Sequence, residues 1–512
     1  MAVTADGRAS RAVLRVCLAT GFVTLLDSAI LTVAAPALRS ELGATTAQLQ
    51  WILAGYSLTF GLALVPAGRL GDRLGRGGPL AVGLALFAVG SLVGATAADA
   101  DVLVAARLLQ GLGAGTANPQ VIGLLQDHYA GPARARALGA YASTGAFAMV
   151  VSPLVGGGIL SAVGPPAGWR AAVGLAAPLG LSVAVVALRV LRRGSTRAGG
   201  LTPPGAPGRD GGAGDGRAAG RRAGGGLSAS RARGGRVGGG FDAVGLVLVT
   251  LVTLGLLVPF VAEGPRAVVL PLSLGVLVAA VGALVVWEPR YARRGRTPVL
   301  APVLLRSPTY VLGCVVAAFS FGAALGYSAV LMLFLQDGAG LSPVQAGLVT
   351  TPGAIASVVA ANLSWRLFRR FGRRGVTVAV GAKALVAAAT ALAVAVAPTA
   401  AVVAVLVLSQ VLTGVVAGLT ISPNQTLTLE GAPGTERGVA GAALQLVQRV
   451  AATVCIAAMT GTFVARTGGA VPGVLDAHRD GLVVVSAAVA ALALVAWAAS
   501  LLDERLARPS TR

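Results

Sequence analysis

The sequence Gly68-Arg69-Leu70-Gly71-Asp72-Arg73-Leu74-Gly75-Arg76 is a polar, glycine-spaced stretch between two long apolar runs. About 20 apolar residues precede it and about 20 follow it, and a run of that length crosses a bilayer as one α-helix. The stretch is therefore predicted to be a short hairpin loop at the membrane surface, with its arginines around one aspartate. Its glycines permit tight turns and close approach of helices, and Asp72 can cap a helix N-terminus or pair with an arginine.

Composition indicates that the whole chain is an integral membrane protein. Of its 512 residues, 55% are hydrophobic and only 12% are charged, and the mean hydropathy is +0.80, which excludes an ordinary soluble domain. Aromatic residues make up only 4%, while alanine, glycine and valine are abundant, as suits helices packed through small residues rather than a β-barrel. The fold class is therefore predicted to be all-α, a polytopic membrane protein.

The formal net charge of +22 would indicate nucleic acid as the partner of a soluble protein. Here the arginines concentrate in loops and in one linker, where they set the orientation and attract anionic lipid headgroups. We therefore expect a lipid bilayer, and no nucleic acid, as a partner.

Apolar runs divide the chain into about fourteen predicted spans. Basic residues gather in alternate connections and acidic residues in the others, so the positive-inside rule predicts that both termini are cytoplasmic. The predicted spans lie near residues 12–36, 48–67, 78–97, 101–125, 137–162, 170–191, 242–261, 267–287, 309–335, 343–367, 375–397, 399–424, 438–464 and 481–502.

The predicted domains follow from one segment, residues 194–240, which is rich in glycine, arginine, alanine and proline and cannot bury a core. We expect a disordered cytoplasmic linker there; RNA binding by its Arg/Gly repeats is a weaker alternative. It separates a six-helix bundle (1–193) from two additional spans (241–290) and a second six-helix bundle (291–512). A degenerate copy of the opening stretch at residues 363–374 supports two related halves, as in transporters with a central substrate site.

The opening stretch resembles the signature loop between helices 2 and 3 of the major facilitator superfamily of secondary transporters, where it is thought to latch the two halves on the cytoplasmic side. The alternative is a merely basic cytoplasmic loop. The resemblance implies a gating role for Gly68, Asp72, Arg73, Gly75 and Arg76.

Asp27 lies well inside the first span, where ionisable groups are costly and mark ion or substrate pathways. Residues 26–36 resemble the first-helix motif of the fourteen-span drug:proton antiporters, and residues 107–115 the superfamily's fourth-helix motif, which implies proton-coupling roles for Asp27 and Arg107. At about 1.5 Å per residue the two lie roughly 14 Å and 9 Å below the same face, within reach of each other. A structural aspartate and a snorkelling arginine are the alternatives.

In the fifth span, residues 152–158 resemble a motif reported mainly in exporters of the superfamily, which implies a bent, tightly packed helix at Ser152, Pro153, Gly156 and Gly157. Ser152 stands where the family usually has glycine. A proline-kinked helix without a functional role is the alternative.

Polar residues on the thirteenth span are predicted to line a central substrate cavity, because Gln445, Gln448 and Arg449 share one helix face near mid-membrane. Gln410 and Asn118 are expected to join them; hydrogen bonds between helices are the alternative.

Three further charged or titratable residues are expected to have no functional role. We expect Lys383 to snorkel to the interface, and His128 and His478 to be solvated at span ends.

The sequence contains no signature of an enzyme or a metal protein. Cys17, Cys314 and Cys455 stand singly in apolar runs, so neither a disulfide framework nor a metal site is predicted. There is no Walker loop, GxSxG or HExxH motif, so we predict neither catalysis nor a cofactor.

Together the motifs resemble the fourteen-span drug:proton antiporters. The resemblance implies a multi-pass transporter in the plasma membrane, typical of bacteria, that exports hydrophobic drugs or antibiotics in exchange for protons. An importer or exporter of another metabolite, and a membrane receptor or scaffold, remain alternatives. The sequence does not give the substrate or the oligomeric state.

Overall fold

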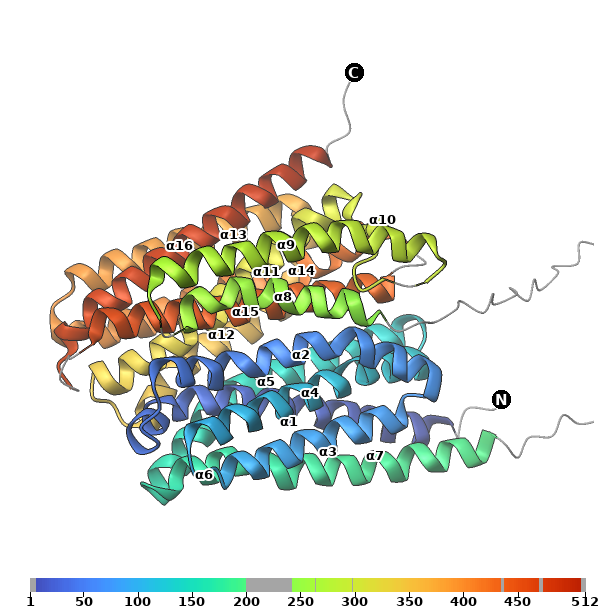
Figure 1. Ribbon diagram of the computed structural model, residues 1–512, viewed down its shortest axis with the longest axis horizontal. Helices are drawn as coiled ribbons and strands as arrows, with labels where there is room; N and C mark the ends of the chain where they lie inside the picture. Colours follow the sequence, from blue (N-terminus) through green and yellow to red (C-terminus); the bar gives the residue numbers. More distant parts are fainter. Residues whose placement is uncertain are drawn as a thin grey trace, which may run out of the picture.

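The computed structural model describes residues 6–198, 242–262, 264–296, 298–433, 437–468 and 473–507, and among these the regular structure is all helical (Figure 1). The all-α prediction is confirmed. The first residues of the predicted linker are helical, since α7 continues to Ala198. The other residues of the predicted linker lie outside the described ranges.

The first seven helices form one group, drawn in blue and teal in Figure 1. In this group α1 packs on α5 and α7, while α4 packs on both α2 and α3. The helices are α1 (Asp6–Glu41), α2 (Thr46–Leu74), α3 (Gly77–Ala95), α4 (Ala100–His128), α5 (Gly131–Val163), α6 (Ala167–Gly174) and α7 (Ala176–Ala198).

The remaining helices form a second group, in which α12 packs on α14, α11 on α15, and α13 on α16. Helices α8 and α9 form a hairpin that packs against α15 and α2. The elements are α8 (Ala243–Val261), α9 (Arg266–Arg293), α10 (Pro302–Leu305), α11 (Pro308–Leu333), the π-helical turn η1 (Phe334–Gly338), α12 (Pro343–Phe371), α13 (Arg373–Val396), η2 (Thr399–Ala401), α14 (Val402–Glu430), α15 (Arg437–Thr467) and α16 (Leu475–Leu506).

Thirteen helical segments within the described residues are long and apolar enough to cross a membrane. Helix α4 is not among them although it has 29 residues, because Arg107, Gln110, Asn118 and Gln120 lower its hydropathy. Since α4 lies between α2 and α3, it completes the fourteen spans that the apolar runs predict.

A single carboxylate anchors the additional α8–α9 hairpin. Asp242 is 2% exposed and caps α8 by accepting a hydrogen bond from the backbone N–H of Gly245 at 2.8 Å. It also accepts one from Nε1 of Trp287 near the end of α9 at 2.9 Å and one from the N–H of Val299 at 3.3 Å. The start of the hairpin, its end and the first residues of the following segment therefore meet at one side chain.

The two groups meet most broadly at one end of the bundle, named here the Leu38 end. There, one apolar cluster includes Leu38 of α1 together with Val330 and Phe463 of the second group. At the opposite end, the Arg76 end, α1, α3, α4, α5 and α7 share one cluster and α10, α11 and α15 share another. A small cluster around Val65 and Leu446 joins α2 to α15.

Two expectations about polar residues in the second group are wrong. Lys383 does not snorkel, because the face of α13 that carries it packs toward α11. Its side chain is 7% exposed, and its Nζ donates a hydrogen bond to the carbonyl of Ser320 in α11 at 2.8 Å. His478 is buried against Phe463 rather than solvated, because α15 and α16 pack together at the Leu38 end. His128 is exposed, as expected.

Candidate functional site

A buried ion pair joins α1 and α4 inside the first group. Nη1 of Arg107 donates to Oδ2 of Asp27 at 2.8 Å and to Oε1 of Gln110 at 2.7 Å, and Nε2 of Gln110 donates to Oδ1 of Asp27 at 3.2 Å. Both carboxylate oxygens thus have partners. Asp27 is 5% and Arg107 1% exposed, so the pair is held away from water and its geometry depends on the charge of Asp27.

Aromatic rings connect this ion pair to the second group. The guanidinium of Arg107 lies 4.6 Å from the ring centre of Tyr56, whose ring centre is 6.0 Å from that of Phe60 one helical turn further along α2. The guanidinium of Arg449 from α15 lies 3.9 Å from the ring centre of Phe60. Two neighbouring rings of α2 therefore each contact an arginine, Tyr56 that of the first group and Phe60 that of the second.

Further aromatic and polar residues surround Arg449. Its guanidinium also lies 5.4 Å from the ring centre of Phe321 in α11. Tyr141 accepts a hydrogen bond from Nδ2 of Asn118 at 3.1 Å, while Oδ1 of Asn118 has no partner among the described residues. The predicted cavity residue Asn118 thus bonds a tyrosine of α5.

The three amides predicted to line the cavity are less closely gathered. Gln445 and Gln448 are half-buried on α15. Gln410 lies on α14 where that helix approaches Gly353 of α12, and a Cβ at 353 would be 2.4 Å from the carbonyl oxygen of Gln410. Oε1 of Gln410 has no partner among the described residues.

Helix α5 contacts α1 through its predicted exporter motif. Oγ of Ser152 donates to the carbonyl of Leu26 at 2.6 Å, directly beside Asp27, and a Cβ at Gly156 would be 3.3 Å from the side chain of Ile30. A serine where the family usually has glycine thus makes a hydrogen bond between the two helices.

The same stretch of α5 packs on α12 of the second group. A Cβ added at Gly157 would be 2.6 Å from the carbonyl oxygen of Pro343, and one added at Gly347 would be 2.8 Å from the carbonyl oxygen of Pro153. Because both contacts are to backbone, the absence of side chains at these two glycines is what permits the close approach.

The opening stretch is not a loop, because α2 continues to Leu74 and only Gly75, at φ +83°, and Arg76 turn the chain into α3. A helical backbone brings Gly71 against α4, where a Cβ would be 1.8 Å from Oε1 of Gln120. Gly68 faces Pro119 of the same helix. The glycines therefore serve helix packing more than turning.

The ion pairs of the stretch stay within the first group. Arg76 pairs with Asp72 at 3.0 Å and, through Nε, with Asp127 at the end of α4 at 2.6 Å. Asp72 thus pairs with an arginine, one of the two roles the sequence left open. Arg73 is exposed. The contact with the other group comes from Arg69, whose Nη2 donates to the carbonyl of Pro298 at 2.7 Å.

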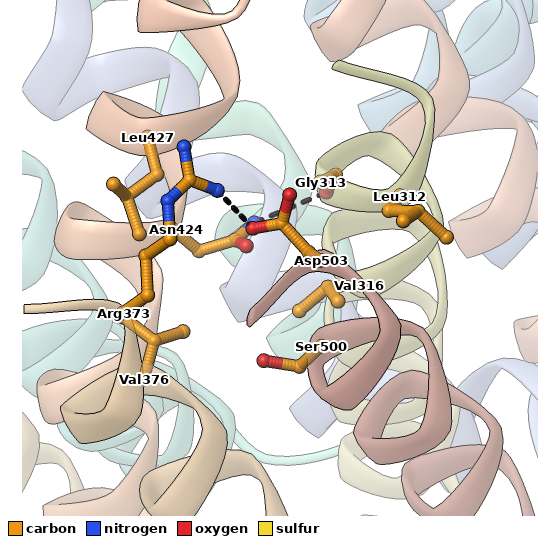
Figure 2. Close-up of a pocket in the computed structure, with 9 residues that line it drawn as sticks. All are labelled: Leu312, Gly313, Val316, Arg373, Val376, Asn424, Leu427, Ser500 and Asp503. Atoms are coloured by element: carbon orange, nitrogen blue, oxygen red, sulfur yellow. Dashed lines mark hydrogen bonds and ion pairs between the residues drawn. The ribbon is translucent and has the colours of Figure 1, made fainter. Parts of the chain in front are cut away.

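The degenerate copy of the stretch has ion pairs of the same kind. Arg373 at the start of α13 pairs with Asp503 of α16 (Figure 2), and Arg374 pairs with Glu504 at 3.3 Å. Asn424 of α14 donates to the carbonyl of Gly313 at the same small pocket. Arg76 just before α3 and Arg373 at the start of α13 are therefore each bonded to a carboxylate of a neighbouring helix.

Sequence reasoning missed Gln110, Tyr56, Phe60, Phe321 and Arg69 as members of these contacts. Gln110 could have been found, since it lies one helical turn after Arg107 on α4. Arg69 stood in the quoted stretch without a role. In the sequence the three aromatic residues cannot be told from other apolar residues of a span. Their contacts with the two arginines arise only where α2, α11 and α15 pack together.

Comparison with known proteins agrees with the motifs. The family described as Major Facilitator Superfamily matches residues 17–456. The chain is 30% identical over 470 residues to the probable actinorhodin transporter of Streptomyces coelicolor, covering 91% of this chain and 74% of that protein.

A second relative and one solved structure extend the comparison. The tetracenomycin C resistance and export protein of Streptomyces glaucescens is 28% identical, over 89% of this chain and 74% of that protein. The crystal structure of a bacterial homologue of the human lysosomal transporter Spinster, inward-facing and unoccupied, superposes with a TM-score of 0.64 at 16% identity and covers 97% of both chains. At that identity the likeness concerns the fold.

Proposed function

The chain belongs to the major facilitator superfamily of membrane transporters, and we propose that it exports hydrophobic antibiotics or drugs across the plasma membrane in exchange for protons. Export rather than import is supported by the names of its relatives, a transporter of actinorhodin and an export protein for tetracenomycin C. The observation that carries proton coupling is the buried Asp27–Arg107 pair, joined through Tyr56 and Phe60 to Arg449 of the opposite group.

Protonation of Asp27 is the proposed coupling step. As a carboxylate, Asp27 holds Arg107 and Gln110 by charge-assisted hydrogen bonds. A protonated Asp27 has no charge to hold the guanidinium, which is then free to reorient against Tyr56. Because α2 also carries Phe60, a shift of α2 at these rings changes its contact with Arg449 in the other group.

Alternating access is supported by the unequal contacts at the two ends. The groups share a broad apolar core at the Leu38 end, and the arginine-rich connections lie at the Arg76 end. With the Arg76 end in the cytoplasm, as the positive-inside rule indicates, the structure is the state closed toward the outside. The proposed domains, two bundles with an additional hairpin between them, are the bodies that rock.

The test uses proteoliposomes loaded with actinorhodin or tetracenomycin C, the compounds named for the relatives. Asp27→Asn should abolish uphill transport driven by an imposed pH gradient while substrate-for-substrate exchange, which needs no net proton movement, persists. A neutral amide costs less to bury than a carboxylate but leaves the charge of Arg107 without a counter-charge, so the melting temperature of each variant is measured beside transport. Asp27→Glu is the matched control, because it keeps a titratable group at the same place and should retain part of the driven transport.

Uphill transport by Asp27→Asn at a rate near that of the unmodified protein would show that Asp27 is structural. Loss of exchange together with driven transport, in a variant that melts at a lower temperature, would point to misfolding rather than coupling. Failure of the unmodified protein to transport either compound along a pH gradient would refute antibiotic export as proposed.

A further inference from the structure

Arg449 is a cation at the centre of the bundle. It lies twelve residues into α15, which begins at Arg437, or about 18 Å at the helical rise of 1.5 Å per residue. Phe60 and Phe321, the rings against its guanidinium, lie near the middle of α2 and α11. A charge at this depth is costly, and charges retained there usually mark a substrate or ion pathway.

Among the residues that the structure describes, no acidic side chain pairs with this cation. None of the ion pairs among the described residues includes Arg449, and both oxygens of Asp27 are bonded to Arg107 and Gln110. The groups that lie against the guanidinium of Arg449 are two ring faces. Ring faces attract a cation through their quadrupole, but they bring no negative charge, so these contacts leave the charge of Arg449 without a counter-charge.

We propose that Arg449 binds the acidic group of the substrate, and that the substrates are therefore aromatic acids whose rings pack among the aromatic side chains around Arg449. The inference rests on the proposed function, since it takes the space between the two groups as the substrate path. An arginine fork matches a carboxylate with two parallel hydrogen bonds. The unpartnered Oδ1 of Asn118, held beside Tyr141, offers an acceptor for a hydroxyl or N–H of the same molecule.

An acidic substrate also changes the electrical character of transport. For a one-for-one exchange, an anion leaving while a proton enters moves two charges in the same direction, whereas a neutral substrate moves one. A membrane potential that is negative inside should then accelerate export of an acid more than export of its neutral ester.

The experiment compares 9-anthracenecarboxylate with its methyl ester, which has the same rings and no charge, by fluorescence anisotropy with the full chain in nanodiscs. The acid should bind about 10- to 100-fold more tightly than the ester. Arg449→Gln should remove that preference, while Arg449→Lys should keep part of it. Arg466→Gln, an exposed position on the same helix, is the matched control and should keep it in full.

Equal affinity for acid and ester, including no measurable binding of either, would overturn the proposal, as would undiminished acid binding by folded Arg449→Gln and Arg449→Lys. A melting curve for each variant separates lost recognition from lost folding. If the acid binds through Arg449 but no compound is moved by a pH gradient, the acid site stands and proton-coupled export is what fails.

Discussion

Replacing Gly157 with alanine should shift the protein away from the state closed at the Leu38 end. In that state a Cβ at 157 would be 2.6 Å from the carbonyl oxygen of Pro343 and 2.9 Å from the backbone nitrogen of Val344, closer than real Cβ contacts. Those atoms belong to α12 of the other group, so the clash exists only while α5 and α12 are closed on each other.

The magnitude follows from the cost of overpacking. Forcing one methyl group against backbone typically costs about 1–3 kcal/mol, and a difference of that size between two states shifts their ratio about 5- to 150-fold. Alanine also raises intrinsic helix stability by about 1 kcal/mol relative to glycine. That second effect is the same in both states and leaves their ratio unchanged.

The matched control is the next residue along the helix. A Cβ at Gly158 would meet nothing within 4 Å, so Gly158→Ala carries the same propensity gain without the clash. Spin labels at the exposed positions Val163 of α5 and Leu348 of α12, in a background with the three cysteines replaced by alanine, report the opening of this end by electron–electron distance measurement. Gly157→Ala should enlarge the long-distance population, and identical distance distributions for the two variants would refute the reasoning.

Three other predictions concern charges and the linker. Arg76→Gln should slow transport in proteoliposomes more than Asp72→Asn at equal expression, because Arg76 also bonds Asp127, whereas an exposed pair one helical turn apart contributes about 0.5 kcal/mol or less; equal rates would contradict this. Lys383→Met should leave transport intact and the melting temperature unchanged or higher, since a backbone carbonyl is the partner of its amine within the described ranges; a loss of transport would instead assign Lys383 a function. Deletion of residues 200–235 should leave membrane insertion and transport nearly unchanged, and a failure to fold would contradict the interpretation of residues 194–240 as a linker.

The spans could be predicted from the sequence because a bilayer imposes a minimum length of apolar helix. The span at residues 101–125 is predicted for the same reason, although α4, the helix that forms it, is not among the thirteen most apolar segments. The meeting of Asp27 and Arg107 followed from their similar depth, a quantity that residue numbers give directly. Their roles in coupling remain a proposal.

What the sequence does not give is which helix faces meet. Lys383 and His478 lie at the expected depths, but their burial depends on neighbours from other helices. The glycines of residues 68–76 favoured a loop, yet the helix persists because Gly71 packs on Gln120. The contact between Phe60 and Arg449 joins residues almost four hundred positions apart. No local sequence pattern predicts such a contact.

The carboxylate of Asp242 has a consequence for how such chains change in evolution. Because it bonds both Gly245 and Val299, the α8–α9 hairpin leaves and returns to the bundle at nearly one point. When a gene segment that encodes such a hairpin is gained or lost, the two chain ends to be joined already lie side by side in the fold. The helices before and after the hairpin therefore need not be displaced. The fourteen-helix architecture is, in this respect, a twelve-helix one with a hairpin added at a single junction.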